Sequence, residues 1–193
     1  MNVMSAARPA IEALKKIGTS LPGVFILEPR VFGDERGFFL ESYNELKMAE
    51  AGITDRFVQD NHSCSSRNVL RGLHYQVKYP QGKLVRVAVG EILDVAVDLR
   101  RSSRTFGKWE AVRLSGENKR MLWIPAGFAH GFRVLSEKAH VLYKATDFYA
   151  PEHERTLAWN DPHLKINWEL DSEPVVSAKD QQGAAFGEAE VFE

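Results

Sequence analysis

Two histidines stand in short polar stretches that have the residue types for catalysis or metal binding. His74 lies in RGLHYQ (residues 71–76), and His130 closes PAGFAH (residues 125–130). Histidine is the side chain whose ordinary pKa lies near neutrality, and its neutral imidazole is also a common metal ligand. The two stretches therefore predict an acid–base site or a metal site, against the simpler interpretation that both histidines are satisfied core or surface residues.

The metal hypothesis follows from the stretch 125–130, whose Pro-x-Gly-x-x-His pattern resembles the second half of the cupin signature. The first half of that signature would bring two histidines separated by one residue. Here the matching place holds His74 and Gln76, and Val134, four residues after His130, offers no polar ligand. Two imidazoles fall short of the three protein ligands of a catalytic zinc or iron site. The sequence therefore predicts no metal and no other cofactor.

The same residue types could instead carry out proton transfer inside a barrel. In a strand through residues 69–77, His74 and Gln76 project from one face, His74 as a base and Gln76 as a substrate contact. A tyrosine on the opposite side could return the proton, and Lys83 could stabilise negative charge on an oxygen. Arg36 and Arg71 could clamp a phosphate group, because the planar guanidinium matches it bidentately. Spacing alone leaves solvated arginines and core tyrosines as the alternative.

The overall composition is that of an ordinary soluble globular protein. The chain has 193 residues, with 25 Lys and Arg against 26 Asp and Glu, so its formal net charge is −1. This charge gives no electrostatic drive toward nucleic acid or an anionic membrane, and we expect neither as a partner. Cys64 is the only cysteine, which excludes an intrachain disulfide. No window approaches the ~20 apolar residues of a membrane span and the start carries no secretion signal, so we expect a cytoplasmic protein.

The elements that would position these residues are mostly short strands with apolar residues at a period of two. The predicted strands cover residues 24–31, 37–43, 56–62, 69–77, 84–89, 92–99, 109–114, 120–124, 131–135 and 140–148. One short helix is predicted over 45–51, and the spacing of Ile11, Leu14 and Ile17 predicts another near the N-terminus. Short strands without alternating helices favour an all-β sandwich or jelly roll over a parallel α/β sheet.

Several longer motifs occur in a fixed order along the chain. They are FGDERG (32–37), FVQDNHS (57–63), LRGLHYQ (70–76), QGKLV (81–85), WIPAGFAHGF (123–132) and WND (159–161). In sequence and order they resemble the dTDP-4-dehydrorhamnose 3,5-epimerase family, metal-independent cupins of dTDP-L-rhamnose synthesis. The resemblance implies a cupin-type double-stranded β-helix, or jelly roll, with short peripheral helices over residues 23–180. Residues 1–22 would then be an N-terminal extension and residues 181–193 a C-terminal tail.

The resemblance also implies roles for individual residues. His74 takes the place of the catalytic base and Asp180 that of the carboxylate that pairs with it. Tyr143 matches the general acid, and Lys83 matches the group that stabilises the enolate. The positions that match substrate-binding residues are Arg36, Glu41, Gln59, Asn61, Arg71, His130, Glu154 and Lys179, with Phe32 and Tyr149 at the aromatics around the thymine ring. The family implies a homodimer in which the N-terminal strands of one subunit contribute to the nucleotide site of the other.

One of these expectations conflicts with regular strand geometry. Strict alternation puts Arg71 and His74 on opposite faces of their strand, whereas the resemblance brings both to one substrate. A β-bulge at Gly72 would place both side chains on the same face.

The expected reaction is the inversion of C3 and C5 of dTDP-4-dehydro-6-deoxy-D-glucose through enolates, which gives dTDP-4-dehydro-L-rhamnose. The nearest alternatives are an enzyme that inverts only one of these carbons and a ketoisomerase of a related dTDP-sugar. A non-catalytic module that binds sugar nucleotides would not need a histidine–aspartate pair opposite a tyrosine. A metal-dependent cupin oxygenase would lack its ligands.

Overall fold

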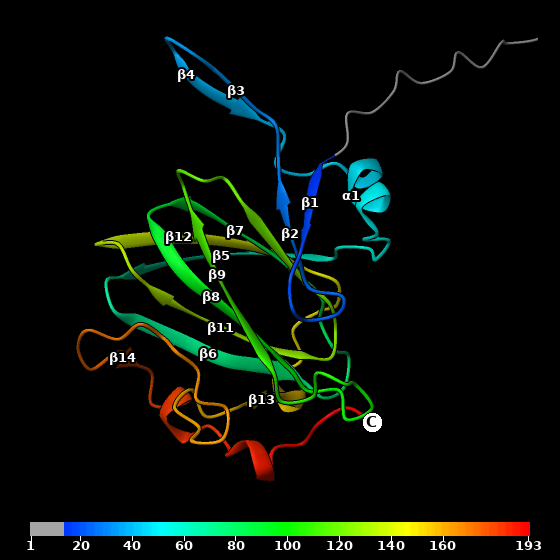
Figure 1. The fold of residues 1–193 in the computed structure, drawn as a ribbon, viewed down its shortest axis with the longest axis vertical. Helices are drawn as coiled ribbons and strands as arrows, with labels where there is room; N and C mark the ends of the chain where they lie inside the picture. Colours follow the sequence, from blue (N-terminus) through cyan, green and yellow to red (C-terminus); the bar gives the residue numbers. More distant parts are fainter. Residues whose placement is uncertain (1–13) are drawn as a thin grey trace, which may run out of the picture.

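The structure, a computed structural model, describes residues 14–193 as two largely antiparallel sheets and a separate hairpin (Figure 1). The first sheet contains, in spatial order, β1 (Lys15–Gly18), β2 (Phe25–Glu28), β10 (Met121–Ile124), β7 (Lys83–Val89), β12 (Lys138–Ala145) and β5 (Gln59–Ser66). The second sheet contains β13 (Glu154–Thr156), β6 (Val69–Gln76), β11 (Phe128–Val134), β8 (Glu91–Asp98) and β9 (Trp109–Ser115), with β14 (Val175–Val176) parallel to β6. This arrangement confirms the all-β jelly roll of the cupin type.

The core lies between the two sheets, because side chains along each strand alternate between the barrel interior and the outside. Val85 of the first sheet and Ile92 and Ala96 of the second are buried in one apolar cluster. Polar residues take inward positions on the same strands: Lys83 stands two residues before Val85, and Asp94 stands between Ile92 and Ala96. The barrel interior is therefore apolar in one part and charged in another.

The hairpin of β3 (Val31–Asp34) and β4 (Gly37–Leu40) projects away from the barrel (Figure 1). Phe32 and Phe39 lie opposite each other in its register, with ring centroids 6.4 Å apart. Their residues are 49% and 68% exposed. Adjacent aromatic rings with this exposure are typical of a surface that binds a partner or a ligand.

The helix predicted over residues 45–51 is confirmed as α1 (Glu45–Ala51). The Asn44 side chain accepts two backbone N–H groups of the first turn, and Gly52, with φ of +97°, ends the helix. Met48 of α1 is buried against the outer face of the first sheet beside Trp123. Within residues 14–193, no helix has the length and apolar character needed to cross a membrane.

The N-terminal helix predicted from apolar spacing is wrong over the residues that the structure describes. Residues 15–18 form β1, which pairs with β2 and places Ile17 opposite Ile26. The open edge of β2 offers a full ladder of backbone hydrogen bonds, and this pairing overrides a weak helical pattern. The rest of that prediction, including Ile11, falls on residues 1–13, which lie outside the described part of the chain.

The predicted strands are otherwise largely confirmed, with shifted ends. The run 24–31 divides into β2 and β3, because Pro29 has no N–H to donate to a ladder. The strand expected at 131–135 begins earlier, at Phe128, and the one expected at 140–148 ends at Ala145.

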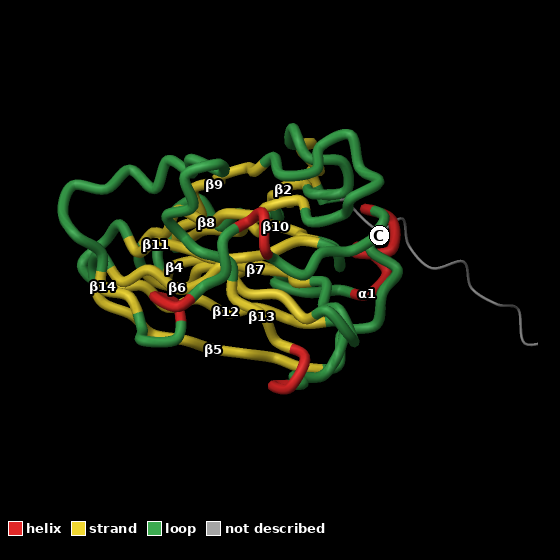
Figure 2. The backbone as a smooth tube through the Cα atoms, turned by 90° about the horizontal axis from the view of Figure 1, so that it is seen from below, coloured by secondary structure: helices red, strands yellow, loops and turns green. Residues whose placement is uncertain are grey.

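A long segment with little regular structure follows β13 and covers the outer face of the second sheet. It includes the short 3-10 helices η2 (Asp180–Gln182) and η3 (Phe186–Glu188), whereas η1 (Pro151–His153) directly precedes β13. Figure 2, seen from below, shows these turns and loops lying over the strands. Leu164 and Trp168 pack in one cluster with Leu70 and Leu73 of β6. The tail is attached too, since the backbone N–H of Phe192 donates to the carbonyl of Leu99 at 3.0 Å.

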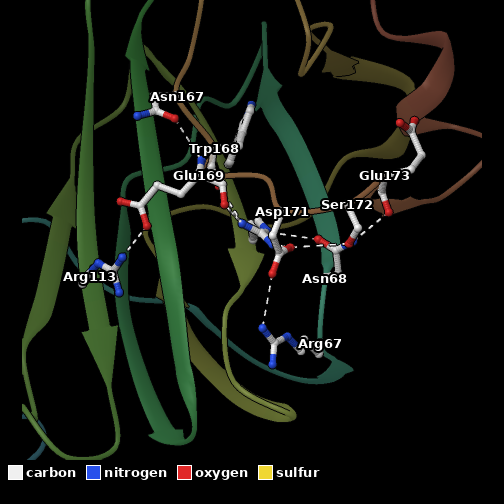
Figure 3. Close-up of polar contacts among 10 residues, drawn as sticks. Arg67, Asn68, Arg113, Asn167, Trp168, Glu169, Asp171, Ser172 and Glu173 are labelled. Carbon is white, nitrogen blue, oxygen red and sulfur yellow. Dashed lines mark hydrogen bonds and ion pairs between the residues drawn. The ribbon is translucent and has the colours of Figure 1, made fainter.

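One buried arginine fixes this segment before it reaches β14. Arg133, which is 3% exposed, donates to the Asn68 side chain at 3.0 Å, to the carbonyls of Trp168 and the next residue, and to the Asp171 carboxylate. Figure 3 shows Asp171 directed also toward Arg67, which it contacts at 3.2 Å. These contacts hold the chain that leads to Asp180.

Candidate active site

Strand β6 carries the first site residues and has the β-bulge predicted at Gly72. His74 lies opposite His130 on β11, and the register then shifts by one residue before Arg71 is reached. Gly72 has φ of +117°, and a Cβ there would lie 2.6 Å from the backbone of β11, so this position requires glycine. Leu73 packs outward, and Arg71 and His74 share the inner face as expected.

His74 and Asp180 form a hydrogen-bonded pair at one end of the barrel. The Nε2 of His74 lies 2.6 Å from Oδ1 of Asp180, and Oδ2 accepts the Gly72 N–H at 3.2 Å. The backbone N–H of Asp180 donates to Ser177 Oγ at 3.1 Å. Burial acts to raise the pKa of Asp180, but the hydrogen bond from His74 and the other donors outweigh burial, so this pKa lies below its usual value. An ionised Asp180 accepts from Nε2–H, which leaves the Nδ1 lone pair of His74 free to act as a base.

Lys83 and Tyr143 come from neighbouring strands of the opposite sheet, β7 and β12. The Lys83 amine is buried and donates to the carbonyl of His74 at 3.4 Å. Burial lowers the pKa of Lys83 to about 8, although the charges of Glu154 and Asp94 oppose that shift. Burial also raises the pKa of Tyr143, and the Glu154 charge adds to this, so the phenol keeps its proton at neutral pH.

A cavity of about 260 Å³ brings the two sheets' polar side chains together. It is lined by Gln59, Asn61, His74, Tyr75, Gln76, Gln81, Lys83, Tyr143, Tyr149 and Glu154. A hollow of the same volume on the outer face of the first sheet shares Asn61 and Tyr143 with it but not His74 or Lys83. We assign the chemistry to the cavity that contains the histidine and the lysine.

Three of the predicted binding residues form one cluster at the cavity. Glu154 accepts a hydrogen bond from the Tyr149 hydroxyl at 2.7 Å and forms an ion pair with Lys179. Burial acts to raise the pKa of Glu154, but Lys179 and Tyr149 outweigh burial, so this carboxylate is ionised at neutral pH. The cluster offers a substrate a phenol, an amine and a carboxylate.

Gln59 and Asn61 lie on β5, with Asn61 opposite Tyr143. Gln59 donates to the Asn61 side-chain oxygen at 3.0 Å and accepts the Tyr149 N–H at 2.9 Å. Among the described residues, the buried Nδ2 of Asn61 has no hydrogen-bond partner. An unsatisfied buried donor at a cavity wall is suited to an oxygen of a bound ligand.

Gln76 lines the cavity, but most of its hydrogen-bonding capacity is used within the protein. Its amide nitrogen donates to the carbonyls of Tyr79 and Phe148 at 2.7 and 3.2 Å, and its oxygen accepts the Ala150 N–H at 2.9 Å. The structure gives Gln76 a role in ordering the loop before η1. A direct contact between Gln76 and substrate stays a prediction.

His130 lies deeper in the barrel than His74 and has a partner that sequence reasoning missed. Its Nε2 is 2.7 Å from Oδ1 of Asp94 on β8. Asp94 is fully buried, and its Oδ2 has no partner among the described residues. The missed signal is a carboxylate in the apolar run ILDVAV (92–97), because a charge in a central strand needs a reason.

Phe32, Arg36 and Glu41 lie on or directly after the projecting hairpin, and none of them lines the cavity of the same chain. Arg36 is paired with Asp34, and Glu41 contacts Lys47 at 3.0 Å. The structure therefore does not bring these three predicted binding residues to His74.

The predicted absence of a metal rests on the first half of the cupin signature, where Gln76 replaces a histidine. In residues 14–193, no group of three or more His, Cys, Asp or Glu side chains is placed to hold a metal ion.

Comparisons with known proteins agree on one family. The family model described as dTDP-4-dehydrorhamnose 3,5-epimerase matches residues 18–188. The dTDP-4-dehydrorhamnose 3,5-epimerase of Pseudomonas aeruginosa is 62% identical over 180 residues, which cover 93% of this chain and 99% of the relative. The crystal structure of a dTDP-6-deoxy-D-glucose-3,5-epimerase from Legionella pneumophila in complex with dTDP-4-keto-L-rhamnose has a TM-score of 0.90 at 52% identity, over 92% of this chain and 95% of that one.

A more distant solved structure has the same fold with a narrower activity. It is a 3′-monoepimerase from Streptomyces bikiniensis in complex with dTDP-quinovose, with a TM-score of 0.83 at 31% identity over 88% of this chain and 86% of that one. The fold alone therefore does not separate single from double epimerases. The match over residues 18–188 and the 62% identity show that the chain belongs to the dTDP-4-dehydrorhamnose 3,5-epimerase family and is an epimerase.

Proposed function

We propose that this cavity inverts C3 and C5 of dTDP-4-dehydro-6-deoxy-D-glucose and releases dTDP-4-dehydro-L-rhamnose. The protein is an isomerase of dTDP-L-rhamnose biosynthesis, like the family to which it belongs. The C4 ketone of the sugar acidifies the hydrogens on both flanking carbons, so each can leave as a proton. The observation that carries the proposal is the His74–Asp180 pair, 2.6 Å apart, at a cavity that Lys83 and Tyr143 enter from the opposite sheet.

The first step is removal of a proton by His74. Its Nδ1 takes the proton, while Nε2–H remains bonded to Asp180. The imidazolium that forms is stabilised by the ionised carboxylate, which also fixes the ring orientation. Asp180 thus acts through His74 and is a positioning residue.

The electron pair left on carbon moves onto the C4 oxygen and forms an enolate. Lys83 is the cation that holds this oxygen, because its amine lies at the cavity and its one hydrogen bond among the described residues is a long one of 3.4 Å. A buried ammonium stabilises an oxyanion more strongly than one in water does, because the local dielectric is low.

Tyr143 returns a proton to the opposite ring face. It stands on β12 of the first sheet, whereas His74 stands on β6 of the second sheet. A sugar ring bound between the sheets meets the base on one face and the acid on the other, and this geometry inverts the carbon. His74 then releases its proton to solvent and Tyr143 takes one up from solvent, and the restored pair repeats the step at the second carbon.

We assign the nucleotide part of the substrate to residues around the mouth and to a second subunit. Arg71 uses Nε for Ser65 at 3.0 Å and, among the described residues, makes no other hydrogen bond, which leaves its terminal nitrogens for a diphosphate. Phe32 and Arg36 would reach this site from the hairpin of a partner in a homodimer, since they lie away from the cavity of their own chain. A dTDP-sugar substrate and a single cysteine support a cytoplasmic location.

The test is turnover of the purified substrate in heavy water, followed by NMR. Deuterium at both C3 and C5 of an L-configured product supports double epimerisation. Deuterium at neither carbon would contradict the proposal.

The second candidate is a single epimerase, which the likeness to the 3′-monoepimerase favours. In that case heavy water labels and inverts only one carbon, and the product keeps the other configuration of the substrate. The same spectra therefore decide between the two.

A further inference from the structure

Asp94 is a buried carboxylate that the reaction described above does not use. It lies on β8 and is 0% exposed, and its Oδ1 accepts a hydrogen bond from His130 at 2.7 Å. Its Oδ2 has no partner, and no lysine or arginine forms an ion pair with it within residues 14–193. A carboxylate without a cation is costly in a protein interior, so a positive charge nearby is needed to keep it ionised.

Lys83, on the facing sheet, is a buried cation without a carboxylate partner among the described residues. The residue is 9% exposed and makes no ion pair with any described side chain. The Glu154 charge acts on Lys83 more strongly than the Asp94 charge does, but Glu154 also forms an ion pair with Lys179. The Lys83 amine donates to the carbonyl of His74, His74 lies opposite His130 on β11, and His130 bonds Asp94. Asp94 is therefore the carboxylate near Lys83 that has no cation of its own.

We propose that Asp94 is the counter-charge that keeps Lys83 protonated in the barrel, and that His130 holds Asp94 in place as a neutral hydrogen-bond donor. This inference rests on the role proposed above for Lys83. Asp94 contacts neither the cavity nor the substrate in this account, so it is a positioning residue that acts through an electrostatic field.

The charge balance of the barrel interior supports this assignment. The titratable groups that line the cavity together with Lys83 are His74, Tyr75, Tyr143, Tyr149 and Glu154. The buried pair of Asp94 on β8 and His130 on β11 adds two more. Tyr143 is neutral at pH 7, His74 is paired with Asp180, and Glu154 is paired with Lys179. Arg71 also shares the inner face, but it is exposed and donates to Ser65. Within the buried interior, Lys83 is then the cation without a carboxylate partner and Asp94 the carboxylate without a cation.

The consequence is a pH limit on catalysis. Burial alone lowers the pKa of Lys83, and the two carboxylates raise it to the value of about 8. Without the Asp94 charge the pKa of Lys83 falls further, and the amine loses its proton at a lower pH. Asp94 thus extends the pH range in which Lys83 remains a cation.

The test is an NMR titration of Lys83 in full-length protein labelled with ¹³C at lysine Cε, with the signal assigned by its loss in Lys83→Met. In the wild type we expect a midpoint near pH 8. Asp94→Asn should lower the midpoint by about one pH unit and move the alkaline limb of kcat/KM by the same amount. Glu91→Gln is the matched control, because it removes a negative charge from the same strand at a surface pair with Arg113, and it should leave the midpoint in place.

A Lys83 midpoint that is the same in Asp94→Asn and in the wild type would overturn the inference. His130→Asn provides a second variant in case Asp94→Asn does not fold. We expect its Lys83 midpoint to stay near the wild-type value, because Asp94 keeps its charge. A rise in the Lys83 midpoint of His130→Asn would overturn the inference as well. It would mean that a positively charged His130 had neutralised the Asp94 charge in the wild type. Full activity of Lys83→Met would instead refute the proposed role of Lys83, so the two failures are distinguishable.

Discussion

Two histidine–carboxylate pairs have their histidines on neighbouring strands of the second sheet, β6 and β11, and differ mainly in their access to the cavity. The nitrogen–oxygen distances are 2.6 Å in His74–Asp180 and 2.7 Å in His130–Asp94. The His74 side chain is 29% exposed and lines the cavity, whereas the His130 side chain is 7% exposed and does not. A base must reach its substrate and exchange its proton with solvent, and the more exposed pair is better suited to this. We therefore infer proton transfer at His74 and a fixed charge at Asp94, and contact between His130 and substrate stays a prediction.

Removing the accessible imidazole of His74 should reduce catalytic activity more than any other change considered below. His74→Ala should lower inversion by about 10⁴-fold, the upper end of what a general base contributes, and should also abolish deuterium exchange. The matched control is His62→Ala, which removes an exposed histidine on β5 that contacts His140 on the outside of the barrel. NMR assays of both variants check the difference. Continued exchange by His74→Ala would assign the base to another group.

Changing the carboxylate of the same pair should have a smaller effect. Asp180→Asn keeps the imidazole but removes the charge that supports it, so we expect a loss of kcat of about 10–100-fold. Since folding lowers the pKa of Asp180, its interactions stabilise the fold above about pH 4 and are lost as the pH falls further. Thermal unfolding at a series of pH values should therefore show a wild-type advantage that disappears in acid. An advantage that does not change with pH would contradict the ionised pair.

The exposed hairpin contrasts with both buried pairs, and its substitution should affect binding rather than chemistry. Phe32→Ala should raise KM for the dTDP-sugar by roughly 3–10-fold with little change in kcat, as expected for loss of one aromatic contact. Phe38→Ala, on the other face of the hairpin, should raise KM less. Steady-state kinetics combined with light scattering check both points. A fully active monomer at micromolar concentration would refute a site shared between subunits.

Removal of metal ions by a chelator should have the smallest effect on turnover. Because Gln76 stands where a metal cupin has a ligand, turnover should be the same before and after dialysis against EDTA. Loss of activity that one added metal restores would contradict an account based on His74 and Lys83.

The sequence predicts the parts of the site that lie in continuous motifs. Arg71 and His74 stand in one strand, and the conflict between their alternation and one shared substrate already required the bulge at Gly72 that the register shows. The partner of His74 comes from 106 residues away in sequence, in a segment whose pattern is weak. Only the resemblance to a known family placed Asp180 beside it.

Other features depend on tertiary context that no local pattern encodes. Lys15–Gly18 become a strand because the edge of β2 is open, despite helical spacing of the apolar residues. Asp94 is visible in the sequence only as an interruption of an apolar run, and its function depends on which strand faces it across the barrel. Pairing across sheets is set by topology, and periodicity within one strand does not report it.

The most direct test of the central claim, that base and acid act from opposite sheets, is Tyr143→Phe assayed in heavy water. With His74 and Lys83 intact the enolate still forms, so we predict that deuterium exchange persists at one carbon. Inversion should fall by ~10²–10⁴-fold, because the phenol that protonates the other face is gone. The ratio of exchange to inversion, measured by NMR in a single reaction, should therefore rise by the same factor. Inversion of both carbons at the wild-type rate would contradict the account.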